Sequence, residues 1–365
     1  MTTAGRWWCV GIGVLLLLAA PVLVSALPAS DAAVPATVVL DRIEQSQDRQ
    51  FSGYVETEGN VAVPESEELS SLSKLVGSTN RLRVWWRDSR TWRVSTLRTS
   101  GETDLVHSEN QTTTWVYESR DVTITPDLEV RLPTTVDLVP NELARRVLEG
   151  ARPEELTRLP ARRVAGRDAL GLRLTPADRQ ASIGHVDVYA DSVTGLPLQV
   201  ELFARDGRFP AISSAFVDVS FDAPDADALS FEPPCPDEVR YDNVVDIASA
   251  ADRFAARVPP STLAGLPSRG DAQGSVRVYG RGPTVLLAVP LWSRTSHRVR
   301  DGLENRPAVR QIDQGYVLAA PPLRMLLADP GPNDTSWLLM GTVTQQALQR
   351  AADELATDRP GLRFP

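Results

Sequence analysis

The chain has 365 residues and a formal net charge of −9, from 38 basic and 47 acidic side chains. This length predicts two domains, since a single hydrophobic core rarely extends over so many residues. No lysine- or arginine-rich block interrupts the acidic balance, which argues against nucleic acid as a partner. Lys74 is the single lysine, a bias that together with the many alanines is typical of a high-GC bacterial genome.

An apolar segment opens the chain. Residues 7–27 contain no charged side chain, and Arg6 stands just before them. A positive flank followed by an apolar run directs export, so we expect residues 1–28 to be a signal peptide or a signal anchor. The small residues 24–26 favour cleavage, whereas the length favours retention, because about 20 apolar residues span a bilayer.

Export determines where the rest of the chain works. The protein is expected on the outer face of the cytoplasmic membrane if the segment is retained, and in the periplasm or outside the cell if it is cleaved. ATP, NAD and nucleic acid are not expected ligands in either place.

The first predicted element after this segment is an amphipathic helix at residues 36–48. Strand patterns then continue to residue 221, with clear alternation of apolar and polar side chains in residues 81–87. A helix at residues 140–150 interrupts them, and residues 184–203 form a hairpin. Many short strands with few helices predict one large antiparallel sheet, curved as an open barrel.

One segment of this region has two interpretations. Residues 64–80 are rich in serine and glutamate but also contain Leu69, Leu72, Leu75 and Val76. They form either a short amphipathic lid or a disordered excursion.

An acidic, proline-rich segment at residues 222–242 is predicted to be the linker between two domains. The first domain then covers residues 33–233 and the second residues 243–365. Helix patterns at about 243–257 and 345–355 enclose several strand patterns, so we expect the second domain to be small and α+β.

Residues that carry chemistry are few and scattered. His107, His185 and His297 have no metal-ligand spacing, and no nucleophile elbow, P-loop or dinucleotide fingerprint occurs. His185 and Asp187 share one face of a predicted strand, either as a general-base pair or as a solvated pair. Cys235 has no cysteine partner after the leader and is interpreted as a packed or linker thiol. We therefore expect no enzyme, no cofactor and no metal.

Aromatic side chains gather in the first predicted domain. Large rings on the inner face of a curved sheet leave an apolar cavity when few helices fill it. The cluster is therefore either plain sheet core or a cavity for an acyl chain or an apolar peptide. The candidate ligand-binding residues are Leu82, Val84, Trp86, Trp92, Val94, Trp115 and Tyr117. Trp85 does not fit on that face and is expected at a rim or a partner contact.

Three segments resemble a known group. Residues 80–86 (Asn-Arg-Leu-Arg-Val-Trp-Trp), residues 164–176 and the hairpin at 185–201 are similar to LolA lipoprotein carriers and MucB/RseB sigma-factor regulators. The hairpin loop follows the pattern Asp-x-x-Thr-Gly-Leu-Pro, which recurs in that group. The likeness covers about residues 36–233, and the added second domain resembles the MucB/RseB type.

The resemblance implies a fold and a role. The fold would be mainly β with α+β, namely an unclosed antiparallel half-barrel with helices in its mouth, followed by a smaller α+β domain. The role would be that of an extracytoplasmic regulator of envelope-stress signalling, which binds the extracytoplasmic part of a membrane anti-sigma factor and a lipid. The alternative is a lipid or lipoprotein carrier that uses the half-barrel cavity. A retained anchor would depart from the soluble members of the group.

Overall fold

The computed structural model describes residues 29–62, 70–127, 131, 133–230, 238–241, 258–269, 275–291, 293–304, 306, 308–329 and 335–357. The expected leader, the helix expected at residues 243–257 and Cys235 lie outside these ranges. Among the described residues, none of the helices combines the length and apolar character needed to span a membrane.

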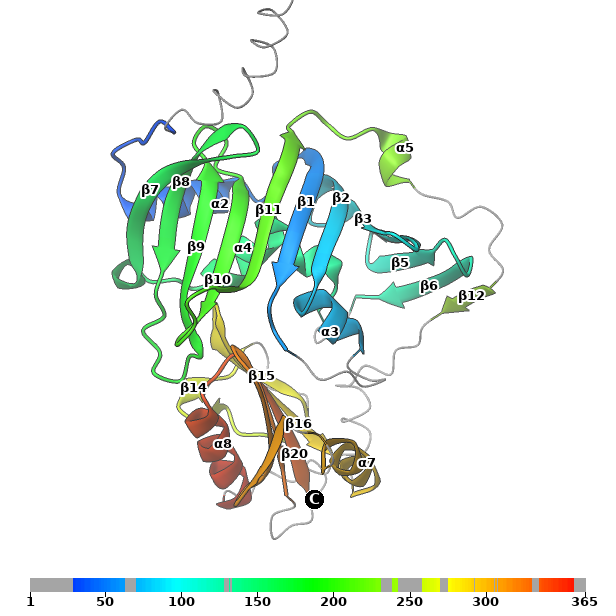
Figure 1. The fold of residues 1–365 in the computed structure, drawn as a ribbon, viewed down its shortest axis with the longest axis vertical. Helices are drawn as coiled ribbons and strands as arrows, with labels where there is room; N and C mark the ends of the chain where they lie inside the picture. The colour runs from blue at the N-terminus through cyan, green and yellow to red at the C-terminus, as the bar shows by residue number, and fades with distance from the viewer. Residues whose placement is uncertain are drawn as a thin grey trace, which may run out of the picture.

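A twelve-stranded sheet forms the first domain (Figure 1), in the order β12-β6-β5-β4-β3-β2-β1-β11-β10-β9-β8-β7. Neighbours are antiparallel except β12, which runs parallel to β6. Since β7 and β12 are the outermost of the described strands, the sheet stays unclosed, which confirms the predicted half-barrel. The strands are β1 (Phe51–Gly59), β2 (Thr79–Asp88), β3 (Thr91–Arg98), β4 (Gly101–Ser108), β5 (Gln111–Val116), β6 (Asp121–Pro126), β7 (Leu156–Val164), β8 (Arg167–Leu174), β9 (Ile183–Asp191), β10 (Pro197–Ala204), β11 (Pro210–Ser220) and β12 (Glu238–Tyr241).

Helices cover one part of the concave face of this sheet. They are α2 (Ala36–Gln45), the 3₁₀ helix η1 (Thr135–Leu138) and α4 (Pro140–Leu148). Proline suits the first position of α4, where its missing N–H would have no intrahelical acceptor. The apolar stripes of α2 and α4 pack on leucines and valines of β7 to β10 and form one core. The helices predicted at residues 36–48 and 140–150 are thereby confirmed.

The loop between β9 and β10 explains the pattern Asp-x-x-Thr-Gly. The Asp191 carboxylate accepts bonds from the Val193 amide at 3.1 Å and from the amide and hydroxyl of Thr194 at 2.7 and 2.8 Å. Gly195 has φ +77°, and a Cβ there would lie 2.3 Å from the Arg42 carbonyl oxygen of α2. Glycine is therefore required both by the turn and by the close approach of the helix.

The second domain is a six-stranded antiparallel sheet in the order β15-β16-β20-β19-β18-β17. Its strands are β15 (Arg277–Arg281), β16 (Thr284–Leu291), β17 (Val309–Ile312), β18 (Gly315–Ala320), β19 (Leu323–Ala328) and β20 (Ser336–Gly341), preceded by the short pair β13 (Thr262–Leu263) and β14 (Leu266–Pro267). The helix α8 (Gln345–Thr357) packs Leu348 against Leu326, and α7 (Ser293–Glu304) packs Leu303 against Leu327 on the opposite face. This confirms the expected smaller α+β domain.

The two domains are joined by a buried ion pair and by backbone bonds. Glu155 of the 3₁₀ helix η2 (Pro153–Glu155) accepts bonds of 2.7 and 2.6 Å from Arg281. Its side chain is 1% exposed. Burial raises the pKa of Glu155, but Arg281 and two backbone amides outweigh this effect and lower it to about 2. Ala181 forms a β-bridge with Val343, so the sheets meet through main chain as well.

The structure bears on two further segments. In the described parts of residues 222–242, α5 (Ala226–Leu229) buries Leu229 and β12 pairs with β6, so these parts contact the first domain. Within residues 64–80, the described part forms the helix α3 (Ser70–Val76), whose Leu75 and Val76 are buried. For residues 70–76 the short helix is therefore the correct alternative.

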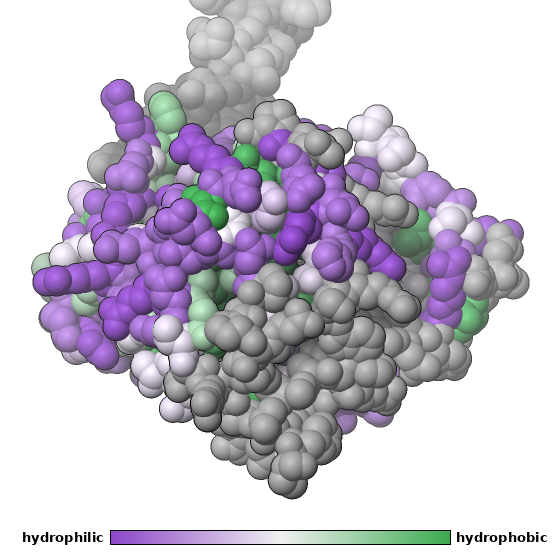
Figure 2. Space-filling model, turned by 90° about the horizontal axis from the view of Figure 1, so that it is seen from below, coloured by the Kyte–Doolittle hydropathy of each residue, from purple (hydrophilic) through white to green (hydrophobic). Residues whose placement is uncertain are grey.

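The surface at the second-domain end of the molecule is mainly hydrophilic among the described residues, and its apolar side chains are scattered (Figure 2).

Candidate functional site

Four rings form a ladder across the concave face, one from each of the strands β1 to β4. The pairs that lie directly opposite in register are Phe51–Trp86, Trp86–Trp92 and Trp92–His107. Their centroids are 5.9, 5.9 and 5.2 Å apart, and their planes lie within 6°, 6° and 15° of parallel. Aromatic cross-strand pairs contribute about 0.5–1.5 kcal/mol each beyond their buried area. The ladder therefore stiffens this face.

A cavity of about 650 Å³ lies between the ladder and the helices α2, η1 and α4. Its buried apolar lining consists of Ile43, Trp86, Trp92, Leu105 and Val136. Buried polar side chains (Ser46, His107 and Glu142) and partly buried threonines also line it, and exposed polar side chains lie at its rim, among them Gln47, Asp48, Ser89, Asp127, Arg131 and Arg145. Small-molecule sites have volumes of roughly 300–1,000 Å³. An apolar interior with a polar rim suits an amphiphile, whose acyl chain would lie inside and whose head group would lie at the rim.

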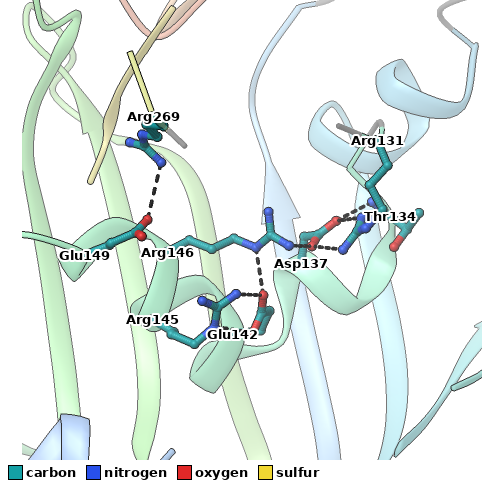
Figure 3. A network of polar contacts seen from close by, with 8 residues as sticks. All are labelled: Arg131, Thr134, Asp137, Glu142, Arg145, Arg146, Glu149 and Arg269. Atoms are coloured by element: carbon teal, nitrogen blue, oxygen red, sulfur yellow. Dashed lines mark hydrogen bonds and ion pairs between the residues drawn. The ribbon is translucent and has the colours of Figure 1, made fainter. Parts of the chain in front are cut away.

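Two buried carboxylates hold the arginines of this rim, Asp137 in η1 and Glu142 in α4 (Figure 3). Arg131 donates two bonds of 2.7 Å to Asp137, and Arg145 donates bonds of 2.8 and 2.6 Å to Glu142. Arg146 bridges the two acids, at 2.7 Å from Asp137 and 2.8 Å from Glu142. The network therefore fixes α4 to η1 beside the cavity.

These contacts also set the charge of the rim. Burial lowers the pKa of Arg131, but its hydrogen bond with Asp137 and the charge of that acid outweigh this effect, and the pKa is raised. The hydrogen bond with Glu142 raises the pKa of Arg145. Both guanidinium groups that line the cavity thus remain charged, and fixed cations of this kind can bind a carboxylate or phosphate head group.

His107 ends the ladder at the cavity wall. Its Nδ1 lies 3.1 Å from the Thr112 hydroxyl and 3.7 Å from an Asp127 carboxylate oxygen. Burial lowers the pKa of His107 below its ordinary value of 6.5, although Asp127 opposes the shift. The imidazole is therefore neutral at pH 7 and adds no positive charge to the interior.

The structure brings together some of the predicted residues and separates others. Trp86 and Trp92 line the cavity, and Leu82, Val84 and Val94 lie on the same face as fully buried core. Trp115 and Tyr117 do not line it, which corrects their predicted placement. Trp115 is opposite Asp104 and Val122 in register, on the convex face, and is 1% exposed there. Tyr117 packs edge-on against it at 5.6 Å.

Trp85 also lies on the convex face. This agrees with the sequence analysis, in which Trp85 did not fit on the inner face. Its ring is 5.7 Å from the guanidinium carbon of Arg83 and 5.1 Å from that of Arg93. The second of these arginines also donates a bond of 2.6 Å to the buried Asp104. The ring is thus enclosed by intramolecular cation–π contacts.

Several lining residues were not found by the sequence analysis. The outer strands β5 and β6 turn threonines toward the cavity, namely Thr112, Thr114 and Thr125. Threonines at positions 112 and 114 alternate as the side chains on one face of a strand do. Because they are polar, the sequence analysis did not assign that face to the interior. The rim residues of α4 could have been found as the polar positions of the helix predicted at 140–150.

The other candidate chemistry is structural. Asp187 forms bonds of 2.6 and 2.7 Å with Arg173, while His185 stacks on Phe203 at 4.3 Å. Neither alternative describes this pair, because Asp187 is buried in an ion pair with Arg173 while the His185 ring is stacked on Phe203. Within the described ranges, no group of three or more His, Cys, Asp or Glu residues could hold a metal ion.

These features define a two-domain protein of the half-barrel type, with a cavity under its helices and an α+β domain fixed to one end. The structure described as "The complex structure of Pseudomonas aeruginosa MucA/MucB" shares this fold, with a TM-score of 0.50 and 18% identity over 87% of this chain and 96% of that one. A crystal structure of MucB in complex with MucA(peri) gives a TM-score of 0.49 at 18% identity, over 87% and 97% of the two chains. The MucB-type fold expected from the sequence is thereby confirmed. No protein-family model and no curated protein matches the chain.

Proposed function

We propose that this protein is an extracytoplasmic regulator of envelope-stress signalling that binds the extracytoplasmic part of a membrane anti-sigma factor. The observation that carries the proposal is the common two-domain fold with MucB, which was solved together with MucA and matches over 87% of this chain. The match includes the second domain, which a carrier of the LolA type lacks. The apolar N-terminal run, which predicts export, agrees with this role.

The cavity supplies the second part of the proposal, a lipid ligand. Its interior is apolar, and the charged Arg131 and Arg145 lie at its rim. Asp48 and Asp127 also line the rim, so the rim carries both signs of charge, and a lipid whose polar head group has an acidic part for the arginines fits this distribution. Binding of such a ligand, rather than catalysis, is the activity we propose, because His107 and His185 stack on aromatic rings and the buried acids Asp104, Asp137 and Asp187 form ion pairs with arginines.

The alternative is a carrier of lipids or lipoproteins, which the cavity alone would support equally well. The fate of residues 1–28 bears on this alternative, since a protein that keeps its membrane anchor cannot shuttle. The mass of the mature chain isolated from cells tests it: a retained segment would contradict the carrier, whereas a cleaved one is compatible with both functions.

Crosslinking in cells tests the leading proposal. The tagged full-length protein is crosslinked, captured under denaturing conditions and analysed by mass spectrometry, with an unrelated exported protein as the control. We expect a single-pass anti-sigma factor to be enriched. Enrichment of lipoproteins or lipid-transfer machinery without such a factor would overturn the proposal in favour of the carrier.

A further inference from the structure

A second hollow, of about 570 Å³, lies where the loop between β10 and β11 meets the second domain. Both domains line it: residues 204–211 belong to the first, and Arg324 and Thr344 to the second. The β-bridge and the Glu155–Arg281 ion pair fix the domains relative to each other, so this interdomain groove is a built feature of the fold.

The groove is cationic in a protein that is acidic overall. Arg205, Arg208 and Arg324 line it, and Asp206 is the one acidic side chain among its described lining residues. Arg208 is exposed and has no hydrogen bond or ion pair within the described part of the chain. Among the described residues Arg324 donates a hydrogen bond of 3.3 Å to the Val343 carbonyl oxygen, and burial lowers its pKa although the charge of Asp206 opposes this shift. A carboxylate in the groove would offset that loss of solvation.

The N-terminus of α8 adds to the positive potential. Thr344 lines the groove, and its hydroxyl accepts a bond of 3.2 Å from the Ala347 amide, as an N-cap does. The first amides of a helix have no intrahelical acceptor, and the helix dipole favours negative charge beside them. Side chains and backbone therefore attract an anion to the same place.

The groove also presents an apolar contact. Phe209 lines it and is 79% exposed, next to Arg208. The described side chains seen from the second-domain end are mainly hydrophilic, with scattered apolar residues (Figure 2). One ring beside guanidinium groups suits a peptide that carries acidic and apolar side chains in alternation, whereas a membrane surface would require a broader apolar face.

We infer that the interdomain groove is the docking site for an extended acidic segment of a protein partner, with Phe209 as the apolar contact and Arg208 and Arg324 as the carboxylate contacts. The identity of the partner rests on the proposed function, because the acidic segment is taken to belong to the anti-sigma factor. The charge complementarity gives fast, salt-dependent association.

Peptide binding tests the groove itself. The probe is a fluorescein-labelled dodecapeptide in which glutamate alternates with leucine and phenylalanine, and its control has lysine in place of glutamate. We expect Arg208→Glu to weaken binding of the acidic peptide about tenfold at low salt and the exposed Arg310→Glu of β17 to leave it unchanged. Phe209→Ser should also weaken binding of the acidic peptide. Because residues 208 and 209 are both exposed, both variants should have the melting temperature of the parent. Equal binding by Arg208→Glu and the parent would overturn the inference, as would equal binding of the lysine peptide.

A photo-crosslinker placed at residue 209 of the full-length protein in cells distinguishes the inference from the proposed function. Capture of an acidic segment of an anti-sigma factor supports both. Capture of an acidic segment from a different kind of protein supports the groove as a docking site but contradicts the proposed partner. An anti-sigma factor that is crosslinked elsewhere on the protein but never at residue 209 overturns the groove and leaves the proposed function standing.

Discussion

The two halves of the large sheet differ in what covers them. On β7 to β10, α2 and α4 fill the concave face with a continuous apolar core that includes Leu172 and Val188. On β2 to β6, the same face leaves a cavity, and the outer strands present threonines and His107 to it. The filled half also holds the second domain, through η2 and the segment before β9.

This difference teaches how one sheet serves two purposes. Leucine and valine on the concave face attract the apolar stripes of helices, and that half becomes the rigid support. Threonine and histidine give no such stripe to pack against, so the other half remains open to a ligand. The following predictions test the contrast, beginning with the largest effect.

Truncation of a core side chain should separate the two halves most clearly. Leu172 is fully buried in the filled half, so Leu172→Ala should lower the free energy of unfolding by about 4 kcal/mol. Leu105 borders the cavity, so Leu105→Ala should cost only about 1–2 kcal/mol, because fewer contacts are lost. Urea unfolding followed by circular dichroism measures both. Equal losses would mean that the two halves are packed alike.

The ion pair between the domains should have the next largest effect. Arg281→Met leaves the Glu155 carboxylate buried without its cation and should cost about 3 kcal/mol at pH 7. The exposed pair Arg350–Glu354 of α8 gives the matched control, and Arg350→Met should cost less than about 0.5 kcal/mol.

The same variant has a predictable pH dependence. Because the pKa of Glu155 is lowered from 4.5 to about 2, its ionised form stabilises the fold above pH 4.5. That stabilisation is lost as the pH falls toward 2. The difference between the parent and Arg281→Met should therefore shrink over this interval, and a difference that stays constant with pH would contradict the buried pair.

Ligand binding should depend on the open half alone. Trp92→Asp places a charge in the cavity wall, and Thr114→Phe fills the cavity without a charge. Each should weaken binding of dansyl-labelled undecanoic acid at least about tenfold, which is 1.4 kcal/mol. Tyr117 is 38% exposed on the convex face, so Tyr117→Leu should bind like the parent. If the Tyr117 variant loses binding while the two cavity variants keep it, the ligand lies on the convex face.

The smallest effect should come from His107. Its lowered pKa means that the unfolded chain binds more protons than the folded one just below pH 6.5. Stability should therefore fall as the pH drops from 7 to 5, and His107→Gln should remove less than about 1 kcal/mol of that fall. Asp127, Arg131 and Asp88 face this side chain in both proteins. Thermal unfolding at the two pH values gives the comparison, and an unchanged slope would contradict a buried neutral imidazole.

The half-barrel was predictable from the sequence because alternation and turn chemistry are local signals. The hairpin that Asp191 and Gly195 close is the best example, since its loop residues make the bonds that the turn needs. The α7 helix was not predicted, because Val299 and Leu303 are almost its only apolar side chains. The face on which Trp115 lies was also predicted wrongly, because it depends on the pairing register of β4 and β5, which the sequence alone does not fix.

The contacts between the two domains also limit how the chain can be truncated or its domains exchanged. A chain ended after residue 241 would expose the Glu155 carboxylate and free the Ser182 amide, which binds the Thr342 carbonyl oxygen at 3.0 Å. The second domain made alone would lose the partner of the Thr344 amide, the Gln180 carbonyl oxygen at 2.7 Å. Recombination that exchanges either domain must therefore carry matching residues at 155 and 281.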